Sequence, residues 1–408
     1  MTMDKGKKKI LFVCQYFYPE VFRGNDVAFH LAKEGHEVHV VTGIPNYPGG
    51  KFFEGYGVFK KRHEMIDGVK VTRLPIVPRG TDSKIKLMLN YFSYMAVACV
   101  WMLFHAIGHK YDRVFVQQLS PVMMSLPGVL YKKLRKVPLY TWVLDLWPES
   151  LTAAGGINNK HVLKFFAWFV KTEYKNSDKI LTSSRSFRDS ILEYGDYADK
   201  IVYYPQWADG SSTSTPADFE LPTIPEGFRL MFAGAVGDAH GFECTMQAAL
   251  LTKEHKDIKW VIVGDGRRLD WVREFVKEHG LEETVATLGR YPAETMPLFF
   301  EQADVMLVTL NDDSLFKLYA PAKISSYMAS GRPIIAVLNG EGGEVIKDAE
   351  CGWHLPAGDA EGFARLVIEL SQTDKAVLQE KGANGRAYYD EHFTKDKCLR
   401  KLDEIMNL

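Results

Sequence analysis

The chain has 408 residues, of which 46% are hydrophobic and 25% are charged. This length exceeds what one hydrophobic core supports and this composition excludes extended disorder, so we expect two folded domains of about 200 residues each. The net charge of −1 conceals a division, because residues 1–200 carry 29 Lys and Arg against 18 Asp and Glu, whereas the remaining residues carry 21 against 33. Since summed charge steers association, the basic first half is predicted to face an anionic surface or acceptor.

Short apolar runs alternate with helical stretches along the chain, which predicts parallel sheets. In the first half the expected strands are 9–15, 36–42, 69–74, 113–118, 139–145, 179–182 and 200–204, with a helix over 27–34. The pattern restarts in the second half, with expected strands at 228–233, 259–263, 285–288, 305–310 and 333–338.

The predicted fold class is α/β, with two doubly wound Rossmann-like domains that face one another across a cleft. We expect the first domain over 1–210, a linker rich in Ser, Thr and Pro over 211–227, the second domain over 228–385, and a C-terminal helix over 386–408 that packs back on the first domain. Ligands of such sheets bind at the carboxyl ends of the strands, so the loops after the strands should hold the functional residues.

The five cysteines are widely spaced, with no CxxC pair and no metal-ligand spacing. Such spacing is typical of reduced thiols in a cytosolic protein. The apolar run near the amino terminus is too short for a signal peptide. The sequence therefore predicts a cytoplasmic protein.

Residues 87–104 form an uncharged stretch of eighteen residues that is just long enough to span a bilayer. The expected strand at 113–118 should join the same sheet as 9–15, and a membrane crossing would separate the two. Two other interpretations stay open, a buried helix and a helix partly exposed at a membrane face.

Basic residues near this stretch favour the membrane face. Lys84 and Lys86 precede it, as an anionic leaflet would favour. A second segment, 161–174, is aromatic on one side and carries Lys164 and Lys171. We therefore expect peripheral contact between the first domain and an anionic membrane surface.

Two loops of the first half carry candidate site residues. Gly24 and Asn25 follow the first expected strand near the start of a helix, whose N–H groups suit an anion, although a plain loop capped by Asn or Asp is the alternative. Asp145 ends a buried strand and precedes an aromatic residue and a proline. A carboxylate there suits a base or an acceptor for a sugar hydroxyl, with an N-cap as the alternative.

Glycines recur at the ends of successive strands in the second half, and this recurrence predicts a nucleotide site. The positions are Gly234, Gly237, Gly264, Gly266 and Gly289, with Gly342 and Gly343 ahead of a later helix. No G-x-G-x-x-G fingerprint is completed, so a dinucleotide is not indicated.

The segment 319–335, YAPAKISSYMASGRPII, holds the most specific local pattern. Pro321 suits the first position of a helix, which puts Lys323 in the first turn, where a cation opposes the helix dipole unless an anion is bound. A diphosphate would resolve this conflict, so we favour diphosphate contact over a solvated or snorkelling lysine.

Together these segments resemble the family 4 glycosyltransferases, retaining enzymes of the GT-B fold. The resemblance is carried by YFYPEVFRGND, TGIPNYPGGKFFEGYG, LDLWPES, SSRSFRDSI, LGRYPAETMPLFFEQADVMLV and PAKISSYMASGRPII, and it extends over nearly the whole chain. The subgroup that these motifs resemble most includes bacterial L-fucosamine transferases of O-antigen and capsule assembly. The resemblance implies that the second domain binds a nucleotide sugar, usually linked to UDP, and that the first domain takes the acceptor, often a lipid diphosphate sugar.

The resemblance also implies roles for individual residues. Asp145 and Lys323 are the expected catalytic residues. The expected donor-binding residues are Gly234, Gly237, Gly264, Gly289, Arg290, Lys323, Ser325, Ser326, Gly342 and Gly343, and the expected acceptor or diphosphate contacts are Gly24, Asn25 and Arg185. No cofactor and no metal are expected, since the family usually needs no metal and the sequence contains no D-x-D triplet.

Two departures from the family pattern stand out. The glutamate pair that many members carry eight positions apart is replaced here by Leu318 and Ser326, so Ser325 or Ser326 is expected to hold the ribose. The usual Arg and Lys after the first strand of the second domain are also missing, and Asp238 and His240 stand in this loop.

We therefore expect a retaining glycosyltransferase in bacterial surface polysaccharide synthesis. It would move a sugar, an N-acetylated aminosugar being one candidate, from a UDP-sugar to a lipid-linked or glycan acceptor at the inner face of the plasma membrane, with no nucleic-acid partner. One alternative is a nucleotide-sugar epimerase of GT-B fold, which would isomerise the sugar without an acceptor. The other is a non-catalytic, membrane-associated glycan-binding protein, which the missing glutamates favour.

Overall fold

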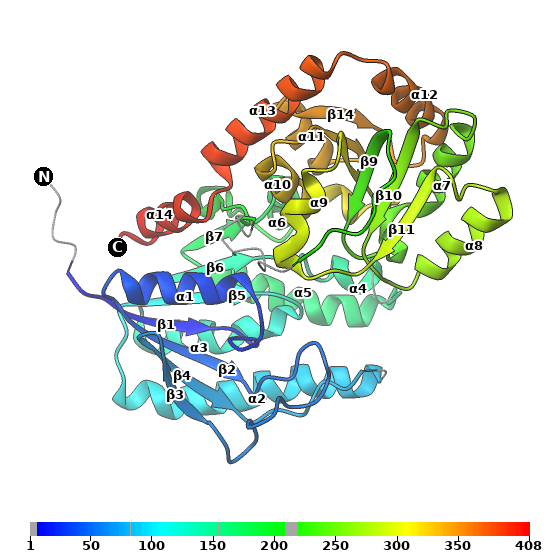
Figure 1. The fold of residues 1–408 in the computed structure, drawn as a ribbon. Coiled ribbons are helices and arrows are strands. Elements are labelled where there is room, and N and C mark those ends of the chain that lie inside the picture. The colour runs from blue at the N-terminus through cyan, green and yellow to red at the C-terminus, as the bar shows by residue number, and fades with distance from the viewer. Residues whose placement is uncertain (1–5, 82, 154–155, 209–218) are drawn as a thin grey trace, which may run out of the picture. The chain divides into compact units, whose positions relative to one another are not determined.

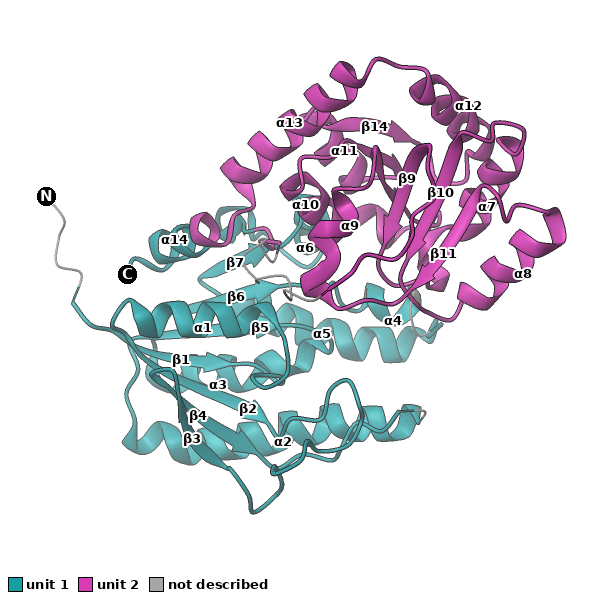
Figure 2. Cartoon of the chain, in the orientation of Figure 1, with its two compact units in different colours: residues 1–204, 399–408 teal, residues 205–398 magenta. Residues whose placement is uncertain are grey.

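The computed structural model describes residues 6–81, 83–153, 156–208 and 219–408. Contacts within the chain divide it into two compact units, coloured separately in Figure 2: unit 1 comprises residues 1–204 and 399–408, and unit 2 comprises residues 205–398. The boundary lies between Tyr204 and Pro205, six residues before the expected position. The expected linker lies partly outside the described residues, and its described part, 219–227, forms no helix or strand.

Unit 1 contains an eight-stranded sheet in the order β3-β4-β2-β1-β5-β6-β7-β8 (Figure 1). Its strands are β1 (Lys9–Val13), β2 (Glu37–Gly43), β3 (His63–Ile66), β4 (Val69–Leu74), β5 (Arg113–Gln118), β6 (Leu139–Val143), β7 (Lys179–Thr182) and β8 (Ile201–Tyr203). Among the described strands of this sheet, only β3 pairs antiparallel, with β4. The sequence pattern missed β3, because this edge strand has four residues and none of them is buried.

The central strands of unit 1 are apolar on both faces because helices cover both faces of the sheet. The helices are α1 (Arg23–Lys33), α2 (Lys84–Gly108), α3 (Leu126–Arg135), α4 (Glu149–Ala153), α5 (Lys160–Asn176) and α6 (Phe187–Leu192), with short 3-10 turns η1 (Val122–Ser125) and η2 (Ala198–Lys200). Figure 1 shows α1 on one face of the sheet and α2 on the other.

Unit 2 contains a six-stranded, fully parallel sheet in the order β11-β10-β9-β12-β13-β14. Its strands are β9 (Phe228–Ala233), β10 (Ile258–Val263), β11 (Val285–Gly289), β12 (Val305–Thr309), β13 (Ile334–Val337) and β14 (Gly352–Leu355). Its helices are α7 (Phe242–Leu251), α8 (Leu269–His279), α9 (Met296–Phe300), α10 (Ala322–Ala329), α11 (Glu341–Asp348), α12 (Ala360–Ser371) and α13 (Lys375–His392), with η3 (Asp238–His240), η4 (Ala293–Thr295) and η5 (Phe316–Leu318). Two doubly wound α/β sheets confirm the predicted fold class.

The C-terminal segment is two helices rather than the single expected helix over 386–408. After α13 ends at His392, α14 (Lys395–Met406) begins, and residues 399–408 belong to unit 1. There the imidazole of His30 and the carboxylate of Asp403 lie 2.8 Å apart, and the carbonyl of Met406 accepts a hydrogen bond from Arg113 Nε at 3.3 Å.

The uncharged stretch of the sequence lies within α2. By length and composition this helix could cross a membrane, and only 28% of its most apolar window is buried. Tyr94, Ala98 and Met102, spaced by four residues, pack into the core under the sheet, and Tyr94 Oη donates to the carbonyl of Cys14 at 2.9 Å. A bilayer crossing would remove this buried face from the sheet, which argues against a transmembrane helix.

Candidate functional site

The glycines of unit 2 gather at the carboxyl edge of its sheet, on the neighbouring strands β9, β10 and β11. A Cβ atom on Gly264 would lie 1.8 Å from the carbonyl oxygen of Gly234, and one on Gly266 would lie 2.3 Å from that of Val236. The Gly234 amide donates to Val263, and the Gly264 amide donates to Gly289. The loops therefore pack backbone against backbone, and only glycine fits at Gly264, where φ is +148°.

Lys323 lies near this glycine edge, in the first turn of α10 as predicted, although Pro321 is the N-cap and not the first helical residue. A Cβ atom on Gly234 would lie 3.0 Å from Lys323 Nζ, and the ammonium stands 3.8 Å from the centroid of the Phe232 ring. Nζ is buried and has no hydrogen-bond partner among the described residues. Burial lowers the pKa of Lys323 to about 7, because the charged form loses its hydration.

Tyr327, one helical turn after Lys323, fixes α10 against β9. Its hydroxyl accepts from the Ala233 amide at 3.0 Å and donates to the Ala233 carbonyl at 2.9 Å. The side chain is fully buried, so these two bonds set the position of the helix against the last residue of the strand. Sequence reasoning missed this role, although the spacing of four residues from Lys323 is the signal that could have indicated a shared helix face.

His240 also faces the Phe232 ring, at a centroid separation of 5.7 Å. Burial, with a smaller contribution from the nearby Lys323, lowers its pKa to about 4. Its Nδ1 is buried and has no hydrogen-bond partner in the described part of the chain. The neutral imidazole of His240 and the amine of Lys323 thus both contact the Phe232 ring, at the carboxyl edge of the sheet where the glycines lie.

The other expected donor residues lie in different environments. Ser325 is buried and its hydroxyl donates to the Ala322 carbonyl at 2.8 Å, whereas Ser326 is half-buried on the same helix. Arg290 is exposed after β11, and a Cβ atom on Gly289 would meet open space. Gly237 precedes η3, near the imidazole of His240.

Gly342 and Gly343 lie in the first turn of α11, where packing explains them. A Cβ atom on Gly343 would lie 2.4 Å from His354 Nε2, and one on Gly342 would lie 3.0 Å from Leu338. The same turn carries Glu341 and Glu344, and Glu341 is only 4% exposed. These acidic residues make the start of α11 a poor place for a phosphate.

In unit 1 the structure corrects the expected start of the first helix. α1 begins at Arg23 with Phe22 at the N-cap, so Gly24 and Asn25 lie within its first turn and neither is a cap. The Asn25 side chain donates to the Glu20 carbonyl at 2.7 Å and accepts from the Tyr18 amide at 3.2 Å, which closes the preceding loop.

Gly24 faces the side chain of Gln117 at the end of β5. A Cβ atom at this position would lie 1.9 Å from Gln117 Oε1, and both polar atoms of that buried amide lack a partner among the described residues. The glycine therefore makes room for a buried amide group at the carboxyl edge of the sheet.

Asp145 lies two residues beyond the end of β6, half-buried at the same edge. Its carboxylate accepts hydrogen bonds from the hydroxyls of Ser120 and Ser150, the second at 2.6 Å. Trp147 Nε1 donates to the Ser120 hydroxyl at 2.9 Å, so the carboxylate is held in one orientation. Arg185, by contrast, is exposed just before α6.

A buried polar network at the carboxyl edge of unit 1 was not predicted. Both carboxylate oxygens of Glu20 accept backbone N–H groups, from Asn46 at 2.8 Å, Tyr47 at 2.7 Å and Phe17 at 3.3 Å. Burial raises the pKa of Glu20 to about 7. The glutamate stands in the same segment as Gly24, which is the sequence signal that could have drawn attention to it.

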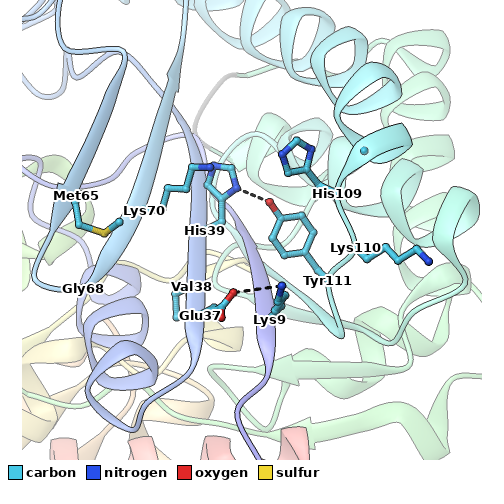
Figure 3. Close-up of a pocket in the computed structure, with 11 residues that line it drawn as sticks. Lys9, Glu37, Val38, His39, Met65, Gly68, Lys70, His109, Lys110 and Tyr111 are labelled. Carbon is cyan, nitrogen blue, oxygen red and sulfur yellow. Dashed lines mark hydrogen bonds and ion pairs between the residues drawn. The ribbon is translucent and has the colours of Figure 1, made fainter.

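Figure 3 shows a cavity of about 410 Å³ in unit 1 that does not coincide with these groups. Lys9 and Glu37, which begin β1 and β2, line it together with Lys70, His109 and Tyr111. It therefore lies at the amino edge of the sheet, opposite the carboxyl edge where candidate side chains gather. Among the described residues, no cluster of three or more His, Cys, Asp or Glu is placed to hold a metal ion.

Comparison with known proteins assigns this architecture to a family. Residues 25–207 match the glycosyl transferase 4-like domain, and residues 227–373 match the glycosyl transferases of group 1. The chain belongs to this glycosyltransferase family and has its GT-B fold, as the sequence motifs predicted.

Individual relatives are distant. The chain is 28% identical to the probable glycosyltransferase WbjE of Pseudomonas aeruginosa over 309 residues. This alignment covers 70% of this chain and 74% of WbjE. It is 22% identical to the amylovoran biosynthesis glycosyltransferase AmsK of Erwinia amylovora, with 95% and 96% of the two chains covered. The structure of Anabaena Alr3699/HepE in complex with UDP superimposes with a TM-score of 0.67 at 15% identity, with 98% and 99% covered.

Proposed function

We propose that this glycosyltransferase moves a sugar from a UDP-sugar to a lipid-linked or glycan acceptor in the synthesis of a bacterial surface polysaccharide. The name of AmsK, a protein of amylovoran biosynthesis, and the UDP bound by HepE support this class of reaction. The fucosamine-transferase subgroup and an N-acetylated aminosugar as the transferred group belong to the same proposal.

The buried, unpaired amine of Lys323 is the observation that carries the proposal. A buried cation that faces an aromatic ring but has no hydrogen bond among the described residues is costly, and the positive end of the α10 dipole increases that cost. The protein bears this cost at the glycine edge of unit 2, where backbone atoms leave space for a ligand close to the sheet. A diphosphate that binds there would supply the missing negative charge.

The same group would also assist the reaction. When the bond between the anomeric carbon and the diphosphate breaks, UDP leaves with the bonding electrons, and protonated Lys323 stabilises the charge that develops on it. An acceptor hydroxyl attacks from the side of the leaving group, so its proton passes to the departing phosphate beside it. Asp145, held by Ser120 and Ser150, is the proposed contact for a sugar hydroxyl.

A panel of UDP-sugars tests the donor site through ligand-induced thermal stabilisation, followed by turnover with an acceptor extract. Lys323→Met, of similar length and without charge, should abolish stabilisation by UDP and reduce turnover at least about 100-fold. Lys317→Met is the matched control, because Lys317 is half exposed and pairs with Asp312 at 2.8 Å in the same unit. Equal UDP binding by wild type and Lys323→Met would remove the lysine from the site.

The products of the same assay separate the alternative functions. Release of UDP that depends on an acceptor supports glycosyl transfer. Isomerised UDP-sugar without an acceptor would identify an epimerase, and binding without turnover over the whole panel would identify a non-catalytic protein.

A further inference from the structure

The exposed side of α2 is uncharged from Leu87 to the end of the helix, after the exposed Lys84 and Lys86 of its first turn. From Leu87 to His109 the chain contains no Asp, Glu, Lys or Arg. Opposite the buried stripe of Tyr94, the helix exposes Val100 by 56%, Phe104 by 71% and Ile107 by 77%. A surface helix of a soluble protein normally carries charged residues on this side, so water is an unfavourable neighbour for this one.

Helix α8 of unit 2 shows the usual arrangement. Its buried residues include Val272 and Val276, and its exposed side carries Asp270, Arg273 and Glu274. The apolar exposure of α2 is therefore a property of this particular helix and not of the fold.

Helices α3 and α5 extend the same surface. The connections that contain α2, α3 and α5 all run from β4 towards β7, which puts these helices on one face of the sheet, and α3 packs between the other two. Arg135 of α3 donates to the carbonyl of Ile107 at the end of α2, at 2.8 Å. On α5 the exposed Phe165 and Trp168 lie between Lys164 and Lys171.

Charge on these three helices is almost entirely positive, although Lys132 of α3 pairs with Asp178, two residues beyond α5. The three helices contain nine Lys and Arg and a single acidic residue, Glu173, which is 1% exposed. Burial holds the pKa of Glu173 well above its usual range, so this carboxyl is neutral and adds no negative charge. Exposed aromatic and aliphatic side chains flanked by lysines match the boundary of an anionic bilayer, where apolar groups enter the acyl region and cations meet headgroup phosphates.

We propose that the exposed sides of α2, α3 and α5 form a docking face that seats unit 1 on an anionic phospholipid membrane, with α2 parallel to the surface. The uncharged part of α2, the 22 residues from Leu87 to Gly108, gives a contact about 33 Å long. This inference does not depend on the proposed donor site, because it concerns a different unit and a different kind of ligand.

Vesicle flotation of the full chain tests the docking face. The chain should bind phosphatidylglycerol vesicles, bind phosphatidylcholine vesicles at least about tenfold more weakly, and lose affinity for phosphatidylglycerol as salt is added. The triple substitution Val100→Gln, Phe104→Gln and Ile107→Gln should reduce binding at least about tenfold. Circular dichroism should show an unchanged fold, because all three side chains are exposed.

The matched control is Leu251→Gln with Val377→Gln, which alters two apolar side chains of unit 2 that are 53% and 40% exposed. This control should bind vesicles like the wild type. Failure of the wild type to bind phosphatidylglycerol at low salt would overturn the proposal, as would equal binding by the triple variant. A dimer that the triple variant dissociates, without vesicle binding, would assign the face to a second copy of the chain.

A depth measurement distinguishes insertion from simple adsorption. Brominated phosphatidylglycerol should quench tryptophan fluorescence of the bound wild type, and Trp168→Phe should lose a share of this quenching. Binding that brominated acyl chains do not quench would contradict insertion of the docking face.

Discussion

The two units share a doubly wound α/β fold, yet they differ in net charge and in the number of hydrophobic side chains that they expose. Unit 1 carries 31 Lys and Arg against 20 Asp and Glu, whereas unit 2 carries 19 against 31. Of the eighteen large hydrophobic side chains that are exposed among the described residues, sixteen belong to unit 1 and two to unit 2. Because both units have the same kind of core, the difference lies in their surfaces and not in the fold.

Each unit also buries at least one ionisable group whose pKa is shifted by burial. Unit 1 buries carboxyls, Glu20 and Glu173, whose pKa values are raised by burial. Unit 2 buries the amine of Lys323, whose pKa is lowered. In both units burial disfavours the charged form of such a group. The stability contributions of Glu20 and Lys323 should therefore change with pH in opposite directions.

The largest expected effect is the loss of the glycine edge in unit 2. Gly264→Ala places Cβ against the carbonyl of Gly234 at a positive φ, so we expect a destabilisation of about 4 kcal/mol or more. Gly24→Ala in unit 1 meets only the far end of the Gln117 side chain, and alanine favours the helix, so its effect should stay within about 1 kcal/mol. Urea denaturation measures both, and equal effects would mean that the β9 and β10 loops can separate.

Lys323→Met should stabilise the protein while it removes nucleotide binding. The pKa of Lys323 is about 7 in the folded state, against an ordinary 10.5. Between these pH values the unfolded state binds more protons, so the stability of the wild type should rise with pH. The advantage of the methionine variant should be of the order of 3 kcal/mol at pH 6 and should shrink as the pH approaches 10. Urea midpoints at several pH values check this, and an advantage independent of pH would show that the lysine is not desolvated.

Glu20→Gln should show the opposite trend in unit 1. The folded-state pKa of about 7 exceeds the ordinary 4.5, so wild-type stability should fall as the pH rises between these values and stay level above them. Glutamine keeps an acceptor for the amides of Asn46 and Tyr47, so the variant should gain about 2 kcal/mol on the wild type from pH 4.5 to pH 8. If the advantage of Glu20→Gln instead shrank as the pH rose, over the same pH range as that of Lys323→Met, the contrast between the units would be refuted.

Removal of divalent cations should have the smallest effect. If the positive groups of unit 2 stabilise the departing diphosphate, turnover in EDTA should equal turnover in magnesium. Initial rates with each addition measure this. Loss of activity in EDTA that magnesium restores would show that a metal ion performs part of this role.

The sequence predicted most of the fold because buried parallel strands are read from short apolar runs. The strands that it missed, β3 and β14, contain no buried residue and so lack the apolar run that marks a strand. They become visible only through their pairing with a neighbouring strand. The start of α1 was placed too late, since Gly24 and Asn25 read as loop residues and only contacts with Gln117 and Glu20 explain them within a helix.

The candidate site shows the same limit. The first-turn position of Lys323 follows from Pro321 alone, because proline and the helix dipole act locally. That its amine is buried against Phe232, unpaired and fixed through Tyr327, depends on β9 and α10, which are about 90 residues apart in the chain. Likewise the role of Glu20 depends on amides of another loop.

The sequence by itself determined the family, the α/β architecture, the division of charge and the helical position of the lysine, because each follows from local pattern. Only the tertiary structure decided which side of α2 faces the core and which apolar side is left exposed, and which polar groups are buried without partners. Burial and pairing are properties of neighbours that are distant in the chain, so no local pattern contains them.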